Sequence, residues 1–189
     1  MRIEAIITDF DGTLVDTFEA NYQAYRQVFD QHGLSLPRDQ YQACFGLRFD
    51  AFMQRMGISD KGLRASIKKE KARIYPDCFR SLVPNRTLIA FIRGMRQSGV
   101  KTAIASTAQR ENLMNVLTSL QLTDLFDEII AGTGVTKGKP DPEIYLKAMK
   151  ILGVEPAATL VFEDTAIGLR AAEASGACYM KITEKFFEP

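Results

Sequence analysis

Apolar residues occur in short unbroken runs along this chain, and most runs are followed by a segment with helical spacing. Residues 3–10, IEAIITDF, are apolar on both alternating faces, which is typical of a parallel strand covered on both sides. Similar runs predict further strands at 100–106, 126–132, 159–164 and 177–182. Amphipathic patterns predict helices at 87–99, 110–122, 142–153 and 166–176. Strands alternating with helices predict an α/β fold with a doubly wound, Rossmann-like parallel sheet.

One long stretch interrupts this alternation. From about Asp16 to Leu82 the pattern is helical without a convincing strand, and it starts with EANYQAYRQVFDQHG. A crossover between parallel strands needs about a dozen residues, whereas this connection has over sixty. We therefore expect an α-helical cap at 16–82, inserted into a core formed by residues 1–15 and 83–189.

The composition and charge of the chain indicate which classes of binding partner and which cellular compartment to expect. Lys+Arg number 24 against 23 Asp+Glu, so nothing suggests a nucleic-acid or anionic-membrane surface, and a small molecule is the favoured partner. Three cysteines are too few and too irregularly spaced for a disulfide framework or a thiolate metal site. No signal peptide and no run near the roughly 20 apolar residues of a membrane span is found. We expect a cytoplasmic protein with reduced thiols.

Polar residues follow four of the predicted strands. In open parallel sheets, ligands bind beyond the carboxyl ends of the strands, so these residues should converge on one edge. In chain order they are Asp9 and Asp11, Ser106 and Thr107, Lys139, and Glu163 and Asp164.

These residue types suggest one chemistry. Carboxylates from different strands are tolerable together around a hard cation, and an oxygen site that retains waters suits Mg²⁺. A hydroxyl, backbone N–H groups at a helix start and a lysine bind phosphate oxygens. Metal, phosphate-binding groups and a further carboxylate together indicate phosphoryl transfer.

The same residues resemble a known family. DFDGTL at 9–14, Ser106 ending TAIAS, Lys139 in GKPDP and ED at 163–164 resemble, in order, the four signature motifs of the haloacid dehalogenase superfamily. The resemblance covers the whole chain, including the cap after the first motif. It is strongest to the phosphoglycolate phosphatase and β-phosphoglucomutase-like branch.

The resemblance implies a role for each motif. Asp9 would attack phosphorus and form an aspartyl-phosphate, and Asp11 would protonate the leaving alcohol and then activate water. Ser106, Thr107 and Lys139 would bind phosphoryl oxygens.

The metal ligands follow from the same resemblance. Mg²⁺ would be bound by Asp9, Asp11 and Asp164, with Glu163 either a ligand or a partner behind the ligands. The predicted protein is a magnesium-dependent phosphatase for a small phosphorylated metabolite, of sugar phosphate or phosphoglycolate type. Dehalogenation is disfavoured because Asp11 supplies the acid that a phosphate ester needs.

Substrate selection is expected in the cap. Gly46 and Arg48, in CFGLRFD at 44–50, are candidates for a substrate loop because relatives place specificity residues there. Lys71 is a further candidate. The alternative for Arg48 is an ordinary surface arginine.

Two other functions stay open. A phosphohexomutase of the β-phosphoglucomutase type would carry a histidine early in the first cap helix, where this chain has Asn21, and a cationic pair that CFGLRFD matches poorly. A phosphorylated receiver-like signalling module is more remote, since a receiver needs neither a cap nor Asp11. Multiple turnover would distinguish an enzyme from such a module.

Overall fold

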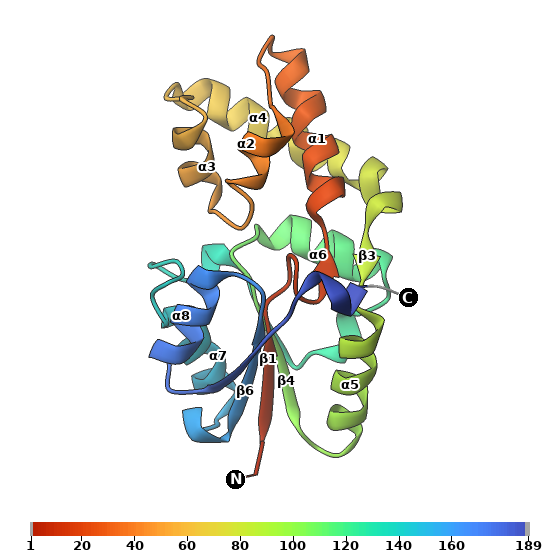
Figure 1. Ribbon diagram of the computed structural model, residues 1–189, viewed down its shortest axis with the longest axis vertical. Helices are drawn as coiled ribbons and strands as arrows, with labels where there is room; N and C mark the ends of the chain where they lie inside the picture. The colour runs from red at the N-terminus through yellow and green to blue at the C-terminus, as the bar shows by residue number, and fades with distance from the viewer. Residues whose placement is uncertain (1, 188–189) are drawn as a thin grey trace. The chain divides into compact units, whose positions relative to one another are not determined.

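The computed structural model describes residues 2–187. Its main element is a five-stranded parallel sheet in the order β5-β4-β1-β6-β7 (Figure 1). The strands are β1 (Ala5–Thr8), β4 (Lys101–Ala105), β5 (Glu128–Ile130), β6 (Thr159–Glu163) and β7 (Cys178–Lys181). All five predicted strands and the doubly wound fold are thus confirmed, with shorter bounds than the apolar runs.

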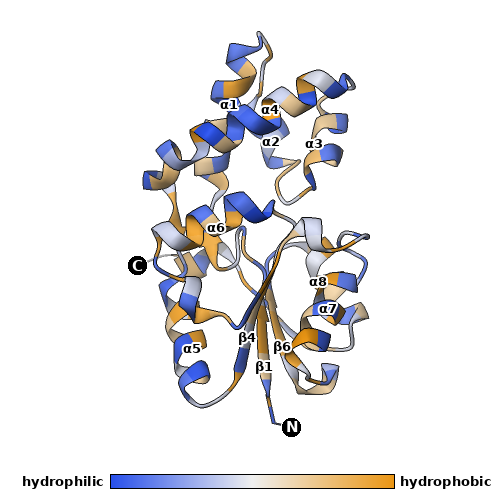
Figure 2. Cartoon of the chain, turned by 180° about the vertical axis from the view of Figure 1, so that it is seen from behind, coloured by the Kyte–Doolittle hydropathy of each residue, from blue (hydrophilic) through white to orange (hydrophobic). Residues whose placement is uncertain are grey.

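Helices cover both faces of this sheet. They are α5 (Arg86–Gln97), α6 (Arg110–Ser119), α7 (Glu143–Leu152) and α8 (Ala166–Ala174), with 3-10 turns η2 (Thr123–Leu125), η3 (Gly132–Gly134), η4 (Pro156–Ala158) and η5 (Glu184–Phe187). Figure 1 shows α7 and α8 on one side of the sheet and α5 on the other. Ile7, Ala103 and Val161 point to the same face because of the strand register, and they pack with Tyr145 of α7 and Ala172 of α8. Figure 2 shows the hydrophobic strands β1 and β6 between these helix layers.

The chain divides into two compact units. The first runs to Asp16 and resumes at Val83, and the second is Thr17–Leu82. The second unit consists of α1 (Phe18–Gln31), α2 (Arg38–Gln42), α3 (Phe49–Arg55), α4 (Lys61–Ile74) and η1 (Tyr75–Ser81). Its core is aromatic: the buried Tyr41 ring contacts those of Phe18, Tyr22, Tyr25, Phe45 and Phe52.

A short antiparallel ladder joins the ends of the first unit where the second is inserted. β2 (Val15–Asp16) pairs with β3 (Val83–Pro84), with Asp16 opposite Val83. Asp16 therefore lies in the first unit, whereas the sequence pattern placed it at the start of the cap. Strands of two residues are too short to show a period, which is why the sequence did not reveal them.

Two smaller features concern disulfide bonds and membrane spans, neither of which the sequence predicts. Cys44, Cys78 and Cys178 are not joined in disulfides. Within the described part of the chain, no helix has both the length and the apolar character needed to cross a membrane.

Candidate active site

Asp9 stands at the carboxyl end of the central strand. Its backbone N–H donates to the Phe162 carbonyl at 2.9 Å, which continues the β1–β6 pairing one residue past β1. The chain then turns back, because the Leu14 and Val15 N–H groups both donate to the Phe10 carbonyl, at 3.1 and 3.0 Å. Asp11 is partly exposed within this turn. The turn therefore presents two aspartates at the end of a buried strand.

Gly12 allows this turn to form. Its φ is 87°, in the region that favours glycine, and its N–H donates to the Val15 carbonyl at 2.8 Å. A Cβ at this position would overlap the Asp164 carboxylate. Asp164, which follows β6, thus lies directly against the turn that carries Asp9. Thr13 Oγ1 also donates to Asp164 Oδ1 at 2.8 Å.

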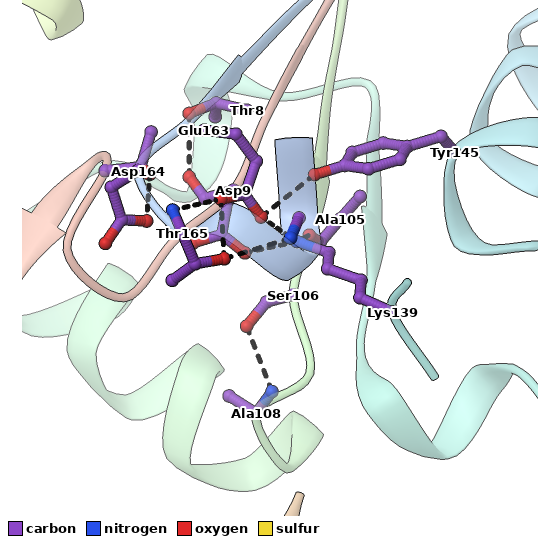
Figure 3. Close-up of polar contacts among 12 residues, drawn as sticks. Thr8, Asp9, Ala105, Ser106, Ala108, Lys139, Tyr145, Glu163, Asp164 and Thr165 are labelled. Atoms are coloured by element: carbon purple, nitrogen blue, oxygen red, sulfur yellow. Dashed lines mark hydrogen bonds and ion pairs between the residues drawn. The ribbon is translucent and has the colours of Figure 1, made fainter. Parts of the chain in front are cut away.

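Lys139 connects three strand ends. Its Nζ donates to Asp9 Oδ1 at 2.5 Å, to Glu163 Oε1 at 2.7 Å and to the Ala105 carbonyl at 3.1 Å (Figure 3). The Lys139 side chain is only 2% exposed, so its charge depends on these partners. The loop before α7 thereby places a cation beside Asp9 and next to the Ser106 backbone.

Glu163 faces the interior rather than the exposed edge of the site. Its side chain is 1% exposed. Besides Lys139, Oε1 accepts from the Tyr145 hydroxyl at 3.2 Å, and Oε2 accepts from the Thr165 N–H at 2.8 Å and the Thr165 Oγ1 at 3.0 Å. Both carboxylate oxygens thus have protein donors. Of the two expected alternatives, this geometry favours a partner behind the ligands over a direct metal ligand.

Ser106 and Thr107 follow β4 and precede α6. The Ser106 N–H donates to the Ile130 carbonyl at 3.0 Å, and its Oγ accepts from the Ala108 N–H at 3.0 Å. Gly132 N–H donates to the Ala108 carbonyl at 2.9 Å, and a Cβ on Gly132 would overlap the Thr107 carbonyl. The backbone of loop 106–108 therefore packs directly against Gly132 of η3, where a side chain would not fit.

The electrostatics of the site leave excess negative charge. Burial alone would lower the pKa of Lys139, but the carboxylates of Asp9 and Glu163 raise it well above its usual value, so this lysine is charged. Burial raises the pKa of Asp9, and repulsion from Glu163 and Asp164 adds to this effect against the opposing Lys139. Burial, followed by Glu163, raises the pKa of Asp164 to about 6. One lysine does not offset three neighbouring carboxylates.

A divalent cation would balance this excess negative charge, although the side chains of the described residues alone do not surround a site for it. Among residues 2–187, no group of three or more His, Cys, Asp or Glu side chains is arranged to hold a metal ion. A magnesium ion usually keeps several waters and needs only one or two carboxylates. Asp9, which precedes this turn, and Asp164, whose carboxylate lies against it, are the donors that suit it.

The three cap candidates belong to the second unit. Gly46, with a φ of 84°, and Arg48 lie in the segment that precedes α3. Lys71 of α4 is 3% exposed, and its Nζ lies 3.4 Å from the Tyr75 ring centroid and 5.2 Å from that of Tyr25. Contact with two tyrosine rings allows this ammonium group to be buried.

Sequence reasoning missed three polar side chains at this site, Thr13, Tyr145 and Thr165. Tyr145 lies on the buried face of α7, and its ring centroid is 4.9 Å from Lys139 Nζ. The helical pattern at 142–153 predicts an amphipathic helix there and no polar role for Tyr145. A tyrosine on a core face was a usable signal, because a buried hydroxyl needs a partner.

Comparison with known proteins identifies the family of this chain. The family model described as haloacid dehalogenase-like hydrolase matches residues 6–182. The chain belongs to this family. The predicted family is therefore confirmed, and its relatives place it in the phosphoglycolate phosphatase and β-phosphoglucomutase-like branch.

Several relatives match nearly the whole chain. A phosphorylated carbohydrates phosphatase of Thermotoga maritima is 31% identical, over 92% of this chain and 82% of that protein. Protein CbbY of Rhodobacter capsulatus is 34% identical, over 93% and 83%. The structure of a CbbY variant from Rhodobacter sphaeroides in complex with xylulose-(1,5)bisphosphate has a TM-score of 0.83 and 26% identity, and covers 96% of this chain and 87% of that one.

Proposed function

We propose that this protein is a magnesium-dependent phosphoric monoester hydrolase that acts through an aspartyl-phosphate on Asp9. The observation that carries the proposal is that Lys139 contacts Asp9, Glu163 and the Ala105 carbonyl at the ends of three parallel strands. Ser106 follows the strand whose last carbonyl also accepts from Lys139. These contacts support a phosphoryl site formed by the proposed nucleophile Asp9, the cation of Lys139 and the Ser106 hydroxyl.

The proposed reaction has two displacements at phosphorus. In the first, an Asp9 carboxylate oxygen forms a bond to phosphorus, the bond from phosphorus to the substrate oxygen breaks, and Asp11 donates a proton to the departing alcohol. In the second, Asp11 removes a proton from water as its oxygen bonds to phosphorus. The Asp9–phosphorus bond then breaks and releases inorganic phosphate.

The other residues stabilise charge on the transferred group. The phosphoryl oxygens would be bound by Lys139, Ser106 and the loop that includes Thr107. Gly12 has no side chain that would block the phosphoryl group from reaching them. Magnesium, bound by Asp9 and Asp164 with the backbone of Asp11, would neutralise part of the negative charge of the phosphoryl group. The donors on Glu163 support a role for it in holding Lys139.

The proposed substrate is a small phosphorylated metabolite of the sugar phosphate class. Support comes from the relatives named as acting on phosphorylated carbohydrates or bound to xylulose-(1,5)bisphosphate. Gly46 and Arg48 are the cap residues proposed to take part in recognition, whereas Lys71 has its ammonium group buried against the Tyr25 and Tyr75 rings. A cationic group is suited to a second phosphate or to sugar hydroxyls.

Phosphate release from p-nitrophenyl phosphate tests the activity. With Mg²⁺ the wild type should turn over many times, and Asp9→Asn should lose about a thousandfold or more of the rate. Asp124→Asn, an exposed aspartate in η2, is the matched control and should keep its activity. Wild-type protein that is inert toward p-nitrophenyl phosphate and a broad panel of phosphate esters would contradict the proposal.

The same experiment separates the alternatives. Isomerisation of glucose 1-phosphate, in place of phosphate release, would identify a phosphohexomutase. A single stoichiometric phosphorylation of Asp9 without turnover would identify a receiver-like module. Removing Mg²⁺ with a chelator should abolish turnover, and adding it back should restore turnover. Activity that persists in the chelator would contradict the proposed metal requirement.

A further inference from the structure

Gly168, in the first turn of α8, has no side chain at a place where one would strike a carboxylate. A Cβ built on it would overlap both Glu163 oxygens and the carbon that joins them. Its φ lies outside the left-handed region, so the backbone conformation does not require glycine. What requires glycine is the space occupied by Glu163.

Glu163 has little freedom to move aside. Four hydrogen bonds hold it: Lys139 and Tyr145 donate to Oε1, and the backbone and hydroxyl of Thr165 donate to Oε2 (Figure 3). Thr165 is also the N-cap residue of α8, because its Oγ1 accepts from the Gly168 N–H at 3.1 Å. The carboxylate is therefore enclosed between the start of α8 and Lys139.

The position of Glu163 matters because Lys139 bridges it to Asp9. Lys139 Nζ lies 2.7 Å from Glu163 Oε1 and 2.5 Å from Asp9 Oδ1. If the Glu163 carboxylate were displaced, the Lys139 ammonium group would either move with it or lose this ion pair. Either movement changes the cation beside the proposed nucleophile.

We propose that Gly168 is a positioning residue, which keeps open the space in which Glu163 holds Lys139 beside Asp9. The consequence for turnover rests on the proposed function, but the packing relation does not. The competing interpretation is that Gly168 is simply a small residue that lets α8 approach the sheet, as the buried Ala171 and Ala172 do. In that case the effect of adding a methyl group would not depend on Glu163.

A double-mutant cycle distinguishes these interpretations. Gly168→Ala should lower kcat/KM about 100-fold, as expected for an ångström-scale misplacement, and should lower the denaturation midpoint. In a Glu163→Ala background the same change should lower kcat/KM by less than about threefold and should no longer lower the midpoint, since alanine is then simply the better helix former. Gly94→Ala, in α5, is the control because its added Cβ meets nothing within 4 Å. It should keep wild-type activity and raise the midpoint.

Each outcome decides the proposal. Equal losses from Gly168→Ala in both backgrounds, or behaviour like that of Gly94→Ala, would overturn it. If Glu163→Ala does not fold, Glu163→Asp, which withdraws the carboxylate by one methylene, replaces it as the background. If the wild type proves inert, the proposed function fails, while the denaturation midpoints alone still decide whether Gly168 acts through Glu163.

Discussion

Replacing Lys139 tests whether this lysine is the counter-ion that makes the site compatible with folding. Lys139→Met keeps a side chain of similar length and removes the charge. Asp9 and Glu163, with 10% and 1% of their side chains exposed, would then face each other without a cation between them. The Ala105 carbonyl would also lose the donor that lies 3.1 Å away.

The size of the effect follows from the geometry. At 2.7 Å and an effective dielectric constant of about 20, each ion pair has a gross Coulomb energy of about 6 kcal/mol. Desolvation of the ions opposes most of this, and removing one partner of a buried pair typically costs about 3–5 kcal/mol. We therefore expect Lys139→Met to reduce the free energy of unfolding by about 3–5 kcal/mol near neutral pH.

Urea denaturation in the presence of a chelator is the assay, because a bound cation would substitute for the missing charge. Lys150→Met, at an exposed position on α7, is the control and should change stability by no more than about 0.5 kcal/mol. Adding Glu163→Gln to Lys139→Met should recover part of the loss, since it removes one of the facing charges. Lys139→Met as stable as the control would refute the argument that Lys139 neutralises this cluster.

Three further predictions address the metal, a loop and a distant ion pair. At about 100 times its dissociation constant, Mg²⁺ should stabilise the wild type by about 2.7 kcal/mol, and thermal melts should show no such gain for Asp164→Asn. Gly132→Ala should destabilise by about 1–3 kcal/mol in urea, because the backbone it would strike cannot move aside. Gly134→Ala in the same turn makes only ordinary contacts and should be nearly neutral. Burial would raise the pKa of Asp127, but hydrogen bonding led by Arg96 keeps it below its usual value. The stability lost in Asp127→Asn, about 1 kcal/mol at neutral pH, should thus disappear as pH falls from the ordinary aspartate pKa through the lower pKa of the folded state. An unchanged difference at low pH would contradict this.

The strand ends are the part of the site that sequence alone predicts well. Period and composition locate the strands, and parallel pairing brings their carboxyl ends to one edge. Asp9 and Lys139 could therefore be placed together before any coordinates existed. Their contact at 2.5 Å agrees with that expectation.

The supporting residues could not be found in the same way. The hydroxyl of Tyr145 reaches Glu163 only because of how α7 packs on the sheet, and helical periodicity cannot show that. Gly132 lies in a 3-10 turn, and the backbone it must admit belongs to a loop more than twenty residues earlier. Both depend on long-range packing, which neither propensity nor spacing encodes.

The adjacent acids Glu163 and Asp164 show how strand geometry divides the work of neighbouring residues. Successive side chains of a strand point to opposite faces. The register sets Val161 beside Ile7, so Glu163 lies on the same face as Asp9 and, with it, meets Lys139 in front of α7 and α8. Asp164, one residue later, turns instead to the loop that contains Gly12 and accepts a hydrogen bond there. One acid thus fixes the lysine, and the other remains at the edge where a cation would balance the charge that Lys139 leaves uncompensated. The sequence supplies two consecutive acids, but only the register assigns them to different sides of the site.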